Sequence, residues 1–193
     1  MQPLRVVLFT ECYRPIQNGV VASVDALAEG LRERGHDVLC ITPTMPGYHE
    51  ANASVVRLPS LPLPTPTAYR LTLPLLSSRH FAHAAGRPSI VHAHSPFVTG
   101  WMGIRTARRY GVPLVFTYHT QLEAYAHYVP FETELTRRAA ALLTRSYANA
   151  ADAVIVPTQT MEHHLRALGV SSRIAVVPSG IDVEFFARGE RRD

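Results

Sequence analysis

The sequence predicts an α/β domain built on a mostly parallel, doubly wound sheet of about seven strands. Short apolar runs rich in β-branched residues alternate along the chain with longer segments of helical periodicity. Glycine follows several of the helical segments, where it is typical of a helix end. Because right-handed crossovers cover both faces of a sheet with helices, this alternation favours a parallel sheet.

In the first half of the chain, the apolar runs predict three strands and one helix. The first run is rich in valine and leucine and is typical of a strand buried on both faces. The helical pattern after it places apolar residues on one face, and Gly35 ends it. Prolines then remove backbone donors, so we expect an exposed, extended segment over 59–66. The expected elements are strand 4–10, helix 20–31, strand 38–42 and strand 55–58.

In the second half, strands and helices alternate more regularly. Ser95 and Pro96 provide a helix start, with a capping hydroxyl followed by proline in the first turn. The helix expected over 132–148 has an alanine and leucine stripe and an arginine face. The expected elements are helix 74–85, strand 90–94, helix 96–111, strand 113–118, helix 132–148, strand 153–156, helix 158–168 and strand 174–177.

The length and composition indicate one large domain without a membrane span. The chain has 193 residues, of which 47% are hydrophobic, enough for a full core. No apolar run approaches the roughly 20 residues that a membrane helix needs. The first apolar run is also too short for a signal peptide, so we expect a cytoplasmic protein. Cys12 and Cys40 have no metal-site spacing, and we expect reduced thiols.

The charge is modestly positive and carried entirely by arginine. The 19 basic residues exceed the 15 acidic ones by four, which fits anionic lipid headgroups, phosphates or nucleic acid as a partner. An ordinary arginine-rich surface explains the same excess. The segments 59–76 and 123–145 combine apolar or aromatic residues with arginines, a combination that suits contact with an anionic membrane but also fits internal packing with solvated arginines.

Unusual polar residues follow three of the expected strands. They lie in the loop 11–19 after the first strand, at His94 and Ser95 after the fourth, and at His119 and Thr120 after the fifth. In open α/β sheets, ligands bind beyond the carboxyl ends of the strands, where the strand order reverses. The first and fourth strands flank that point in a doubly wound sheet, so we expect these loops to meet in one cleft.

The first loop and the histidines each have a functional and a structural interpretation. Gly19 opens a helix whose amide groups attract anions, and it lets the backbone approach a diphosphate, although Asn18-Gly19 also fits an ordinary turn. A neutral His119 can bond a sugar hydroxyl or move a proton, or it can simply bond backbone. His92 and His94 share a strand face, but no third ligand suggests a metal site.

Five motifs follow one another in an order that resembles a known family. Their order and spacing, over 4–186, are similar to those of the GT4 family of retaining glycosyltransferases. The stretch 119–128 most resembles the branch that glucosylates diacylglycerol, and mannosyltransferases acting on phosphatidylinositol lipids are similar too. The motifs are TECYRPIQNGV (10–20), VHAHSPF (91–97), TYHTQLEAYAHYV (117–129), ADAVIVPTQ (151–159) and VVPSGID (176–182).

The resemblance implies a GT-B enzyme, in which two Rossmann-like domains enclose a cleft and no metal or cofactor is required. The loop with Asn18 and Gly19 then approaches the diphosphate and sugar of the donor, although many relatives have Gly-Gly there. His119 matches the catalytic histidine that contacts the donor sugar near the reacting carbon. The residues expected at the acceptor side of the cleft are Tyr13, His94, Ser95, Phe97, Thr120, Tyr125, His127 and Tyr128.

The resemblance also implies a domain organisation and a function. Residues 1–178 match the N-terminal, acceptor-binding domain, residues 179–193 match the start of the interdomain linker, and the C-terminal, donor-binding domain with its E-x7-E motif is absent. We expect a parent enzyme, peripheral on the inner face of the cell membrane, that transfers a hexose from a nucleotide sugar such as UDP-glucose to a lipid such as diacylglycerol. The isolated chain should be inactive and prone to self-association.

Three alternatives remain open from the sequence. The acceptor can instead be a phosphatidylinositol lipid, a sugar or a small thiol precursor. The chain can also be a stand-alone binding module that does not catalyse. Nucleic-acid binding rests only on the basic charge, because no basic stripe with interleaved aromatic residues is present.

Overall fold

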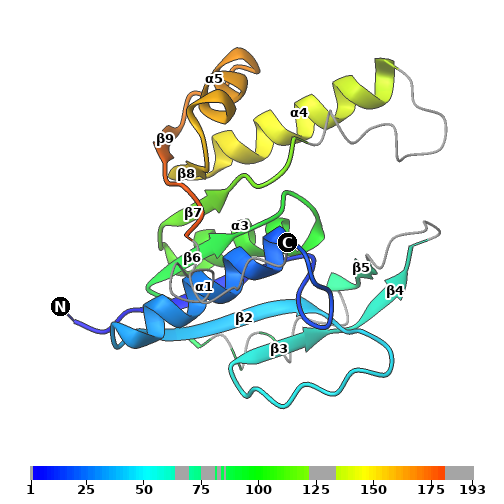
Figure 1. Cartoon of the computed structure of the whole chain (residues 1–193), viewed down its shortest axis with the longest axis vertical. Helices are drawn as coiled ribbons and strands as arrows, with labels where there is room; N and C mark the ends of the chain where they lie inside the picture. Colours follow the sequence, from blue (N-terminus) through cyan, green and yellow to red (C-terminus); the bar gives the residue numbers. More distant parts are fainter. Residues whose placement is uncertain are drawn as a thin grey trace, which may run out of the picture.

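Seven parallel strands form the central sheet of the protein in a computed structural model that describes residues 2–63, 70–74, 81, 84, 86–121 and 134–180 (Figure 1). Every pairing within this sheet is parallel, and the order is β3-β2-β1-β6-β7-β8-β9. This confirms the predicted Rossmann-like, doubly wound fold class. The strands are β1 (Arg5–Phe9), β2 (Asp37–Pro43), β3 (Val55–Leu58), β6 (Ile90–Ala93), β7 (Leu114–Thr117), β8 (Ala153–Val156) and β9 (Arg173–Val176).

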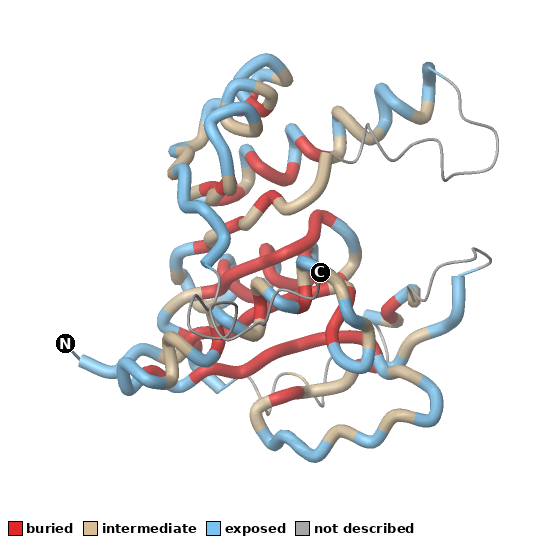
Figure 2. Tube along the Cα trace, in the orientation of Figure 1, coloured by how far each residue is buried: buried red, intermediate tan, exposed pale blue. Residues whose placement is uncertain are grey.

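Helices cover the sheet on both faces because alternate residues of a buried strand point to opposite sides. Val6 and Leu8 of β1 pack with buried residues of α1, whereas Val7 and Phe9 pack in a core shared with the other helices. The central strands are accordingly buried along their length (Figure 2). The helices are α1 (Gly19–Glu33), α3 (Val98–Tyr110), α4 (Glu134–Ala150) and α5 (Gln159–Ala167).

The strand order reverses between β1 and β6, as the sequence predicted. From β1 the chain builds outward to β2 and β3, and it then returns to β6 on the other side of β1. The amide of His94, just past β6, donates to the carbonyl of Phe9 at the end of β1 at 2.8 Å. The loops after β1 and β6 therefore leave the sheet side by side, at the edge where ligands bind in such folds.

The proline-rich segment differs from the prediction of a purely extended chain. It contains a short antiparallel pair, β4 (Ser60–Pro62) and β5 (Arg70–Thr72), with Leu61 opposite Leu71. Pro62 is tolerated because a two-stranded ribbon leaves one side of each strand without a ladder. The guanidinium of Arg70 also donates to the carbonyl of Ser60 at 2.9 Å. Most of the helix expected over 74–85 lies outside the described residues.

No helix within the described ranges combines the length and the apolar character that crossing a bilayer requires.

Candidate functional site

The loop after β1 ends in a helix cap. The side-chain oxygen of Asn18 accepts a hydrogen bond from the amide of Val21 at 2.9 Å, and the extended backbone of Asn18 is typical of an N-cap. Gly19 opens α1 and is exposed, and a β-carbon at Gly19 would have no neighbour within 4 Å. A bulky anion can therefore approach the positive end of the α1 dipole at this backbone.

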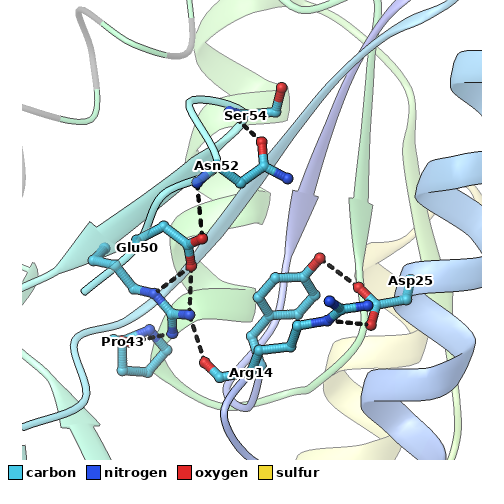
Figure 3. Close-up of polar contacts among 8 residues, drawn as sticks. Arg14, Asp25, Pro43, Glu50, Asn52 and Ser54 are labelled. Atoms are coloured by element: carbon cyan, nitrogen blue, oxygen red, sulfur yellow. Dashed lines mark hydrogen bonds and ion pairs between the residues drawn. The ribbon is translucent and has the colours of Figure 1, made fainter. Parts of the chain in front are cut away.

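Asp25 on α1 fixes the conformation of the same loop. Its two carboxylate oxygens accept hydrogen bonds from the Tyr13 hydroxyl at 2.5 Å and from Nε of Arg14 at 2.9 Å (Figure 3). Tyr13 is buried, and burial, followed by the bond to Asp25, raises its pKa. The structure thus places Tyr13 beneath the loop, where it supports the backbone, although the sequence suggested it for the open cleft.

Arg57 on β3 ties the loop to the sheet. Its guanidinium forms an ion pair with Glu50 at 2.7 Å and donates to the backbone carbonyl of Arg14 (Figure 3). It also lies 5.0 Å from the ring centre of Tyr48 and 5.7 Å from that of Tyr13, within cation–π range. Sequence reasoning missed Arg57 because its partners lie in three separate segments of the chain.

An open pocket of about 420 Å³ lies beside this loop and the first turns of α1. Its lining combines apolar, aromatic and amide side chains with the Arg14–Asp25 ion pair. Among the described residues, it includes Asn18 from the predicted site but not Phe97 or His119. The lining residues are Arg14, Pro15, Ile16, Gln17, Asn18, Val21, Ala22, Asp25 and Tyr48.

Glu11 joins the loop after β1 to the start of α3. One carboxylate oxygen accepts the amide of Thr99 at 3.2 Å, and the other accepts the hydroxyl of Thr72 at 3.4 Å. The N-cap residue of α3, Phe97, provides no side-chain cap, so Glu11 satisfies a helix amide that is otherwise unpaired. Burial raises the pKa of Glu11, although these hydrogen bonds act in the opposite direction.

The loop after β6 packs directly onto the first turn of α3. A β-carbon on Gly100 would lie only 1.9 Å from the Ser95 carbonyl oxygen, so only glycine fits at this position. The Tyr147 hydroxyl of α4 donates to the carbonyl of Gly100 at 2.8 Å. Ser95 is therefore a buried packing position, whereas Phe97 and Trp101 are 43% and 41% exposed at the same end of α3.

Three histidines stack along one face of β6 and β7. His92 is on β6 with His94 just past its end, and Thr117 ends β7 with His119 two residues further on, so all four side chains share a face. Nε2 of His92 lies 2.7 Å from the hydroxyl of Thr117, and Nδ1 of His94 lies 2.9 Å from Nε2 of His119. The rings stack, with centres 4.4 Å apart for His92–His94 and 5.2 Å apart for His94–His119.

Burial keeps this histidine stack uncharged near neutral pH. Burial lowers the pKa of His92 to about 3 and that of His119 to about 4. Burial, followed by repulsion from the neighbouring rings, lowers the pKa of His94 well below its usual range. A neutral imidazole has one donor and one acceptor nitrogen, so His119 can bond a polar substrate without attracting a counterion.

The described parts of the three loops lie close together at this edge of the sheet. Glu11 contacts the first turn of α3, and His94 contacts His119 after β7. His119 and Thr120 are half-buried, so both have accessible surface at this edge. The other expected cleft residues of this region, Tyr125, His127 and Tyr128, lie outside the described residues. Across the described ranges, no three His, Cys, Asp or Glu side chains are grouped to hold a metal ion.

Comparison with known proteins identifies glycosyltransferases as relatives. The chain is 30% identical over 190 residues to an alpha-monoglucosyldiacylglycerol synthase of Acholeplasma laidlawii, covering 95% of this chain and 48% of that protein. It is 33% identical over 196 residues to a GDP-mannose-dependent alpha-mannosyltransferase of Mycobacterium tuberculosis, covering 98% of this chain and 51% of that protein. The chain thus spans about half the length of the curated relatives that it matches.

The fold and a family model agree with these relatives. A sucrose-phosphate synthase structure from Thermosynechococcus elongatus is similar with a TM-score of 0.59 and 19% identity, covering 96% of this chain and 93% of that chain. At this identity the likeness supports the fold alone. The model of Glycosyltransferase Family 4 matches residues 17–185. Since that match spans most of the chain and the relatives align along nearly all of it, the protein belongs to Glycosyltransferase Family 4.

Proposed function

We propose that this chain is the N-terminal, acceptor-side domain of a retaining glycosyltransferase. In this proposal residues 1–178 form the domain, 179–193 begin the linker, and a second Rossmann-like domain holds the nucleotide. The two-domain enzyme transfers a hexose from UDP-glucose to a membrane lipid such as diacylglycerol. The observation that supports it most is the neutral, half-buried His119 at the carboxyl edge of the sheet, in a chain aligned over 95% of its length with a glucosyldiacylglycerol synthase.

In the proposed mechanism, the chain contributes hydrogen-bond donors rather than charge. The exposed backbone at Asn18 and Gly19 approaches the diphosphate of the donor, and the α1 dipole stabilises the negative charge that develops on the leaving nucleotide. His119 donates a hydrogen bond to a hydroxyl of the donor sugar near the reacting carbon. The resemblance implies retention of the anomeric configuration with no metal or cofactor.

The acceptor is proposed to enter over the same edge. Phe97 and Trp101 are exposed aromatic side chains one helical turn apart at the start of α3, and they can pack against a lipid. His94 and Thr120 lie next to His119, and Tyr125, His127 and Tyr128 are proposed to complete the acceptor side. A lipid acceptor stays in the bilayer, so the enzyme is proposed to bind the inner face of the cell membrane peripherally.

A transfer assay tests this function. Two-domain protein carrying this chain is incubated with radiolabelled UDP-glucose and diacylglycerol in detergent micelles, and the 193-residue chain is assayed in parallel. We expect labelled glycolipid only from the two-domain protein, with the α-anomer as product. Protein that is folded and binds UDP-glucose, but glucosylates neither diacylglycerol nor another lipid acceptor, would contradict the proposal.

Transfer of mannose is the second candidate, because the mannosyltransferase relative is 33% identical over 98% of this chain. The same assay with GDP-mannose, and with phosphatidylinositol or free sugars as acceptors, separates the two candidates. The donor that supports the higher kcat/KM identifies the sugar, and the labelled product identifies the acceptor class.

A further inference from the structure

We infer that His94 is a positioning residue that sets the tautomer of His119. His94 donates its Nδ1 proton to Nε2 of His119, so that His119 keeps its own proton on Nδ1. His119 can therefore donate a hydrogen bond to a substrate from Nδ1. It has no unprotonated nitrogen at that position to accept a proton. The consequence for sugar transfer rests on the proposed function, whereas the tautomer itself does not.

The contact between the two rings allows only two arrangements. Nδ1 of His94 and Nε2 of His119 are 2.9 Å apart, a hydrogen-bond distance that requires one proton between them. Each neutral imidazole carries one N–H. Either His94 donates from Nδ1 and its Nε2 is a bare acceptor, or His119 donates from Nε2 and the proton of His94 sits on its Nε2.

The surroundings of His94 distinguish these arrangements. His94 is 5% exposed, and within the described part of the chain its Nε2 is buried without a hydrogen-bond partner. A buried N–H with no acceptor costs about 1–3 kcal/mol, whereas an acceptor nitrogen without a donor is better tolerated. The favoured arrangement therefore leaves Nε2 of His94 unprotonated, with its proton on Nδ1 toward His119.

The stack also holds the ring of His94 in this orientation. Its plane is within 22° of His92 and within 23° of His119, and Nε2 of His92 is bonded to the hydroxyl of Thr117. Burial lowers the pKa of His92, His94 and His119, which disfavours a doubly protonated ring near neutral pH. All three rings are thus neutral, and the direction of the hydrogen bond decides where their protons lie.

The tautomer determines what His119 can do chemically. Its Nε2 is occupied by His94, and Nδ1 makes no hydrogen bond with any described residue. With the proton on Nδ1, His119 recognises an oxygen lone pair, as on a sugar hydroxyl or an oxygen that gains negative charge. It cannot accept a proton at Nδ1, so we expect it to act as a hydrogen-bond donor and not as a general base.

Nuclear magnetic resonance of the 193-residue chain tests the inference directly. Protonated and unprotonated imidazole nitrogens resonate far apart in long-range ¹H–¹⁵N correlation spectra, and ¹⁵N-histidine labelling makes them visible. The cross-peaks that disappear in His119→Asn belong to His119, and those that disappear in His94→Asn belong to His94, so the two variants assign the two rings. At pH 7.5 we expect both rings to be protonated on Nδ1. A spectrum in which His119 is protonated on Nε2 would overturn the inference.

A matched set of variants then tests whether His94 is the cause. His94→Asn places a carboxamide, which can donate or accept, near the position of Nδ1, so it serves for the assignment only. His94→Phe keeps a flat ring but removes the donor, so His119 should lose this preference. His92→Phe makes the same change two residues earlier and should leave the His119 tautomer unaltered. Retention of the Nδ1 proton in folded His94→Phe would show that His94 does not set the tautomer.

These outcomes are separable from the proposed function. The spectra report the tautomer without any donor or acceptor present, so an inactive two-domain protein with the expected spectrum would contradict sugar transfer alone. If His94→Phe does not fold, the spectrum of the unaltered chain still decides which nitrogen of His119 carries the proton.

Discussion

At the scale of single residues, side chains beneath the loops shape the edge where chemistry is proposed. Asp25 and Arg57 each bond the loop after β1 from another element, and Glu11, within that loop, bonds the first turn of α3. His119 differs from them because it is half-buried with one ring nitrogen occupied by His94. The supporting residues define the positions of the loops, and His119 is the group that can meet a substrate.

Replacement of His119 tests this distinction. In the two-domain protein, His119→Ala should lower kcat on the order of 10²–10³-fold, because it removes a donor that acts in a water-poor site. KM should change much less, and the circular dichroism spectrum should be unchanged. His163→Ala, an exposed histidine on α5, is the matched control. An unaltered kcat in His119→Ala would return this residue to a structural role.

Buried His92 should make stability depend on pH. Burial lowers its pKa from 6.5 to about 3, so the unfolded chain binds the proton more readily between these values. The free energy of unfolding should then rise with pH by up to about 1.4 kcal/mol per unit, with the contribution complete above pH 6.5 and lost on acidification. Burial raises the pKa of Glu11, so the folded chain binds this proton more readily than the unfolded chain. The contribution of Glu11 to the free energy of unfolding therefore falls as the pH rises through its titration range.

The measurement compares urea unfolding at pH 4.5, 5.5 and 6.5. His92→Gln keeps a donor near Thr117 but does not titrate, so its free energy of unfolding should vary less steeply with pH. His163→Gln controls for the loss of a histidine on the surface of α5. Equal slopes for His92→Gln and the unaltered chain would show that His92 does not contribute.

At the scale of elements, close backbone contacts seat each helix on the sheet. The first turn of α3 touches the loop after β6, since a β-carbon at Gly100 would lie 1.9 Å from the Ser95 carbonyl oxygen. Gly100→Ala should therefore lower the free energy of unfolding by about 1–3 kcal/mol or more, because the backbone must move. Gly30→Ala, inside α1 with only the end of Arg34 nearby, should instead raise it by about 0.5–1 kcal/mol. Urea unfolding measures both, and equal effects would refute the contact.

Substitution of Asn18 at the N-terminus of α1 tests whether this residue only caps the helix or also helps to bind the nucleotide sugar. Asn18→Ala removes the cap to Val21 and should cost about 1 kcal/mol of stability. Thr158→Ala removes the comparable cap to Met161 in α5 and should cost a similar amount. In the two-domain protein, only Asn18→Ala should also raise the KM for the nucleotide sugar. If both variants raise it equally, Asn18 acts on stability alone.

Hydrophobic periodicity located the elements because each pattern is local. The seven strands of the parallel sheet and helices α1, α3, α4 and α5 lie within two residues of their predicted bounds. The β4–β5 pair was missed because its prolines obscure a strand pattern, and a ribbon needs only three residues on each side. Sequence placed His94 and His119 at one edge of the sheet. Their hydrogen bond, and that of Glu11 to Thr99, depend on tertiary packing between distant segments.

At the scale of the whole molecule, α4 and the β4–β5 pair extend toward the same side, beyond the carboxyl ends of the strands (Figure 1). Leu135 and Leu142 on α4 are 74% and 60% exposed, and Arg138 lies on the same helix face. Leu61 and Leu71, paired across β4 and β5, are 53% and 42% exposed. Exposed leucines beside arginines are typical of a surface that lies in a membrane interface.

This arrangement predicts reversible, salt-sensitive binding to anionic vesicles. Each arginine near an anionic surface contributes about 1 kcal/mol, screened by salt, so removing three should weaken binding about tenfold to 100-fold. The exposed ion pair of Arg138 with Glu134 is too weak to prevent this. The test variant replaces Arg137, Arg138 and Arg145 of α4 by Ser. The control removes the same charge from another helix, replacing the exposed Arg105, Arg108 and Arg109 of α3 by Ser.

Co-sedimentation of the 193-residue chain with vesicles decides between a specific surface and overall charge. We expect binding to phosphatidylglycerol vesicles at low salt, less binding at high salt, and little binding to phosphatidylcholine. The α4 variant should lose binding, whereas the α3 control should keep most of it, because the two sets differ in position and not in charge. Equal losses of binding in both variants would show that the net charge of the chain, and not a specific surface on α4, causes the attraction. Binding to neutral and anionic vesicles alike would remove its electrostatic part, and no binding to either would contradict the membrane surface itself.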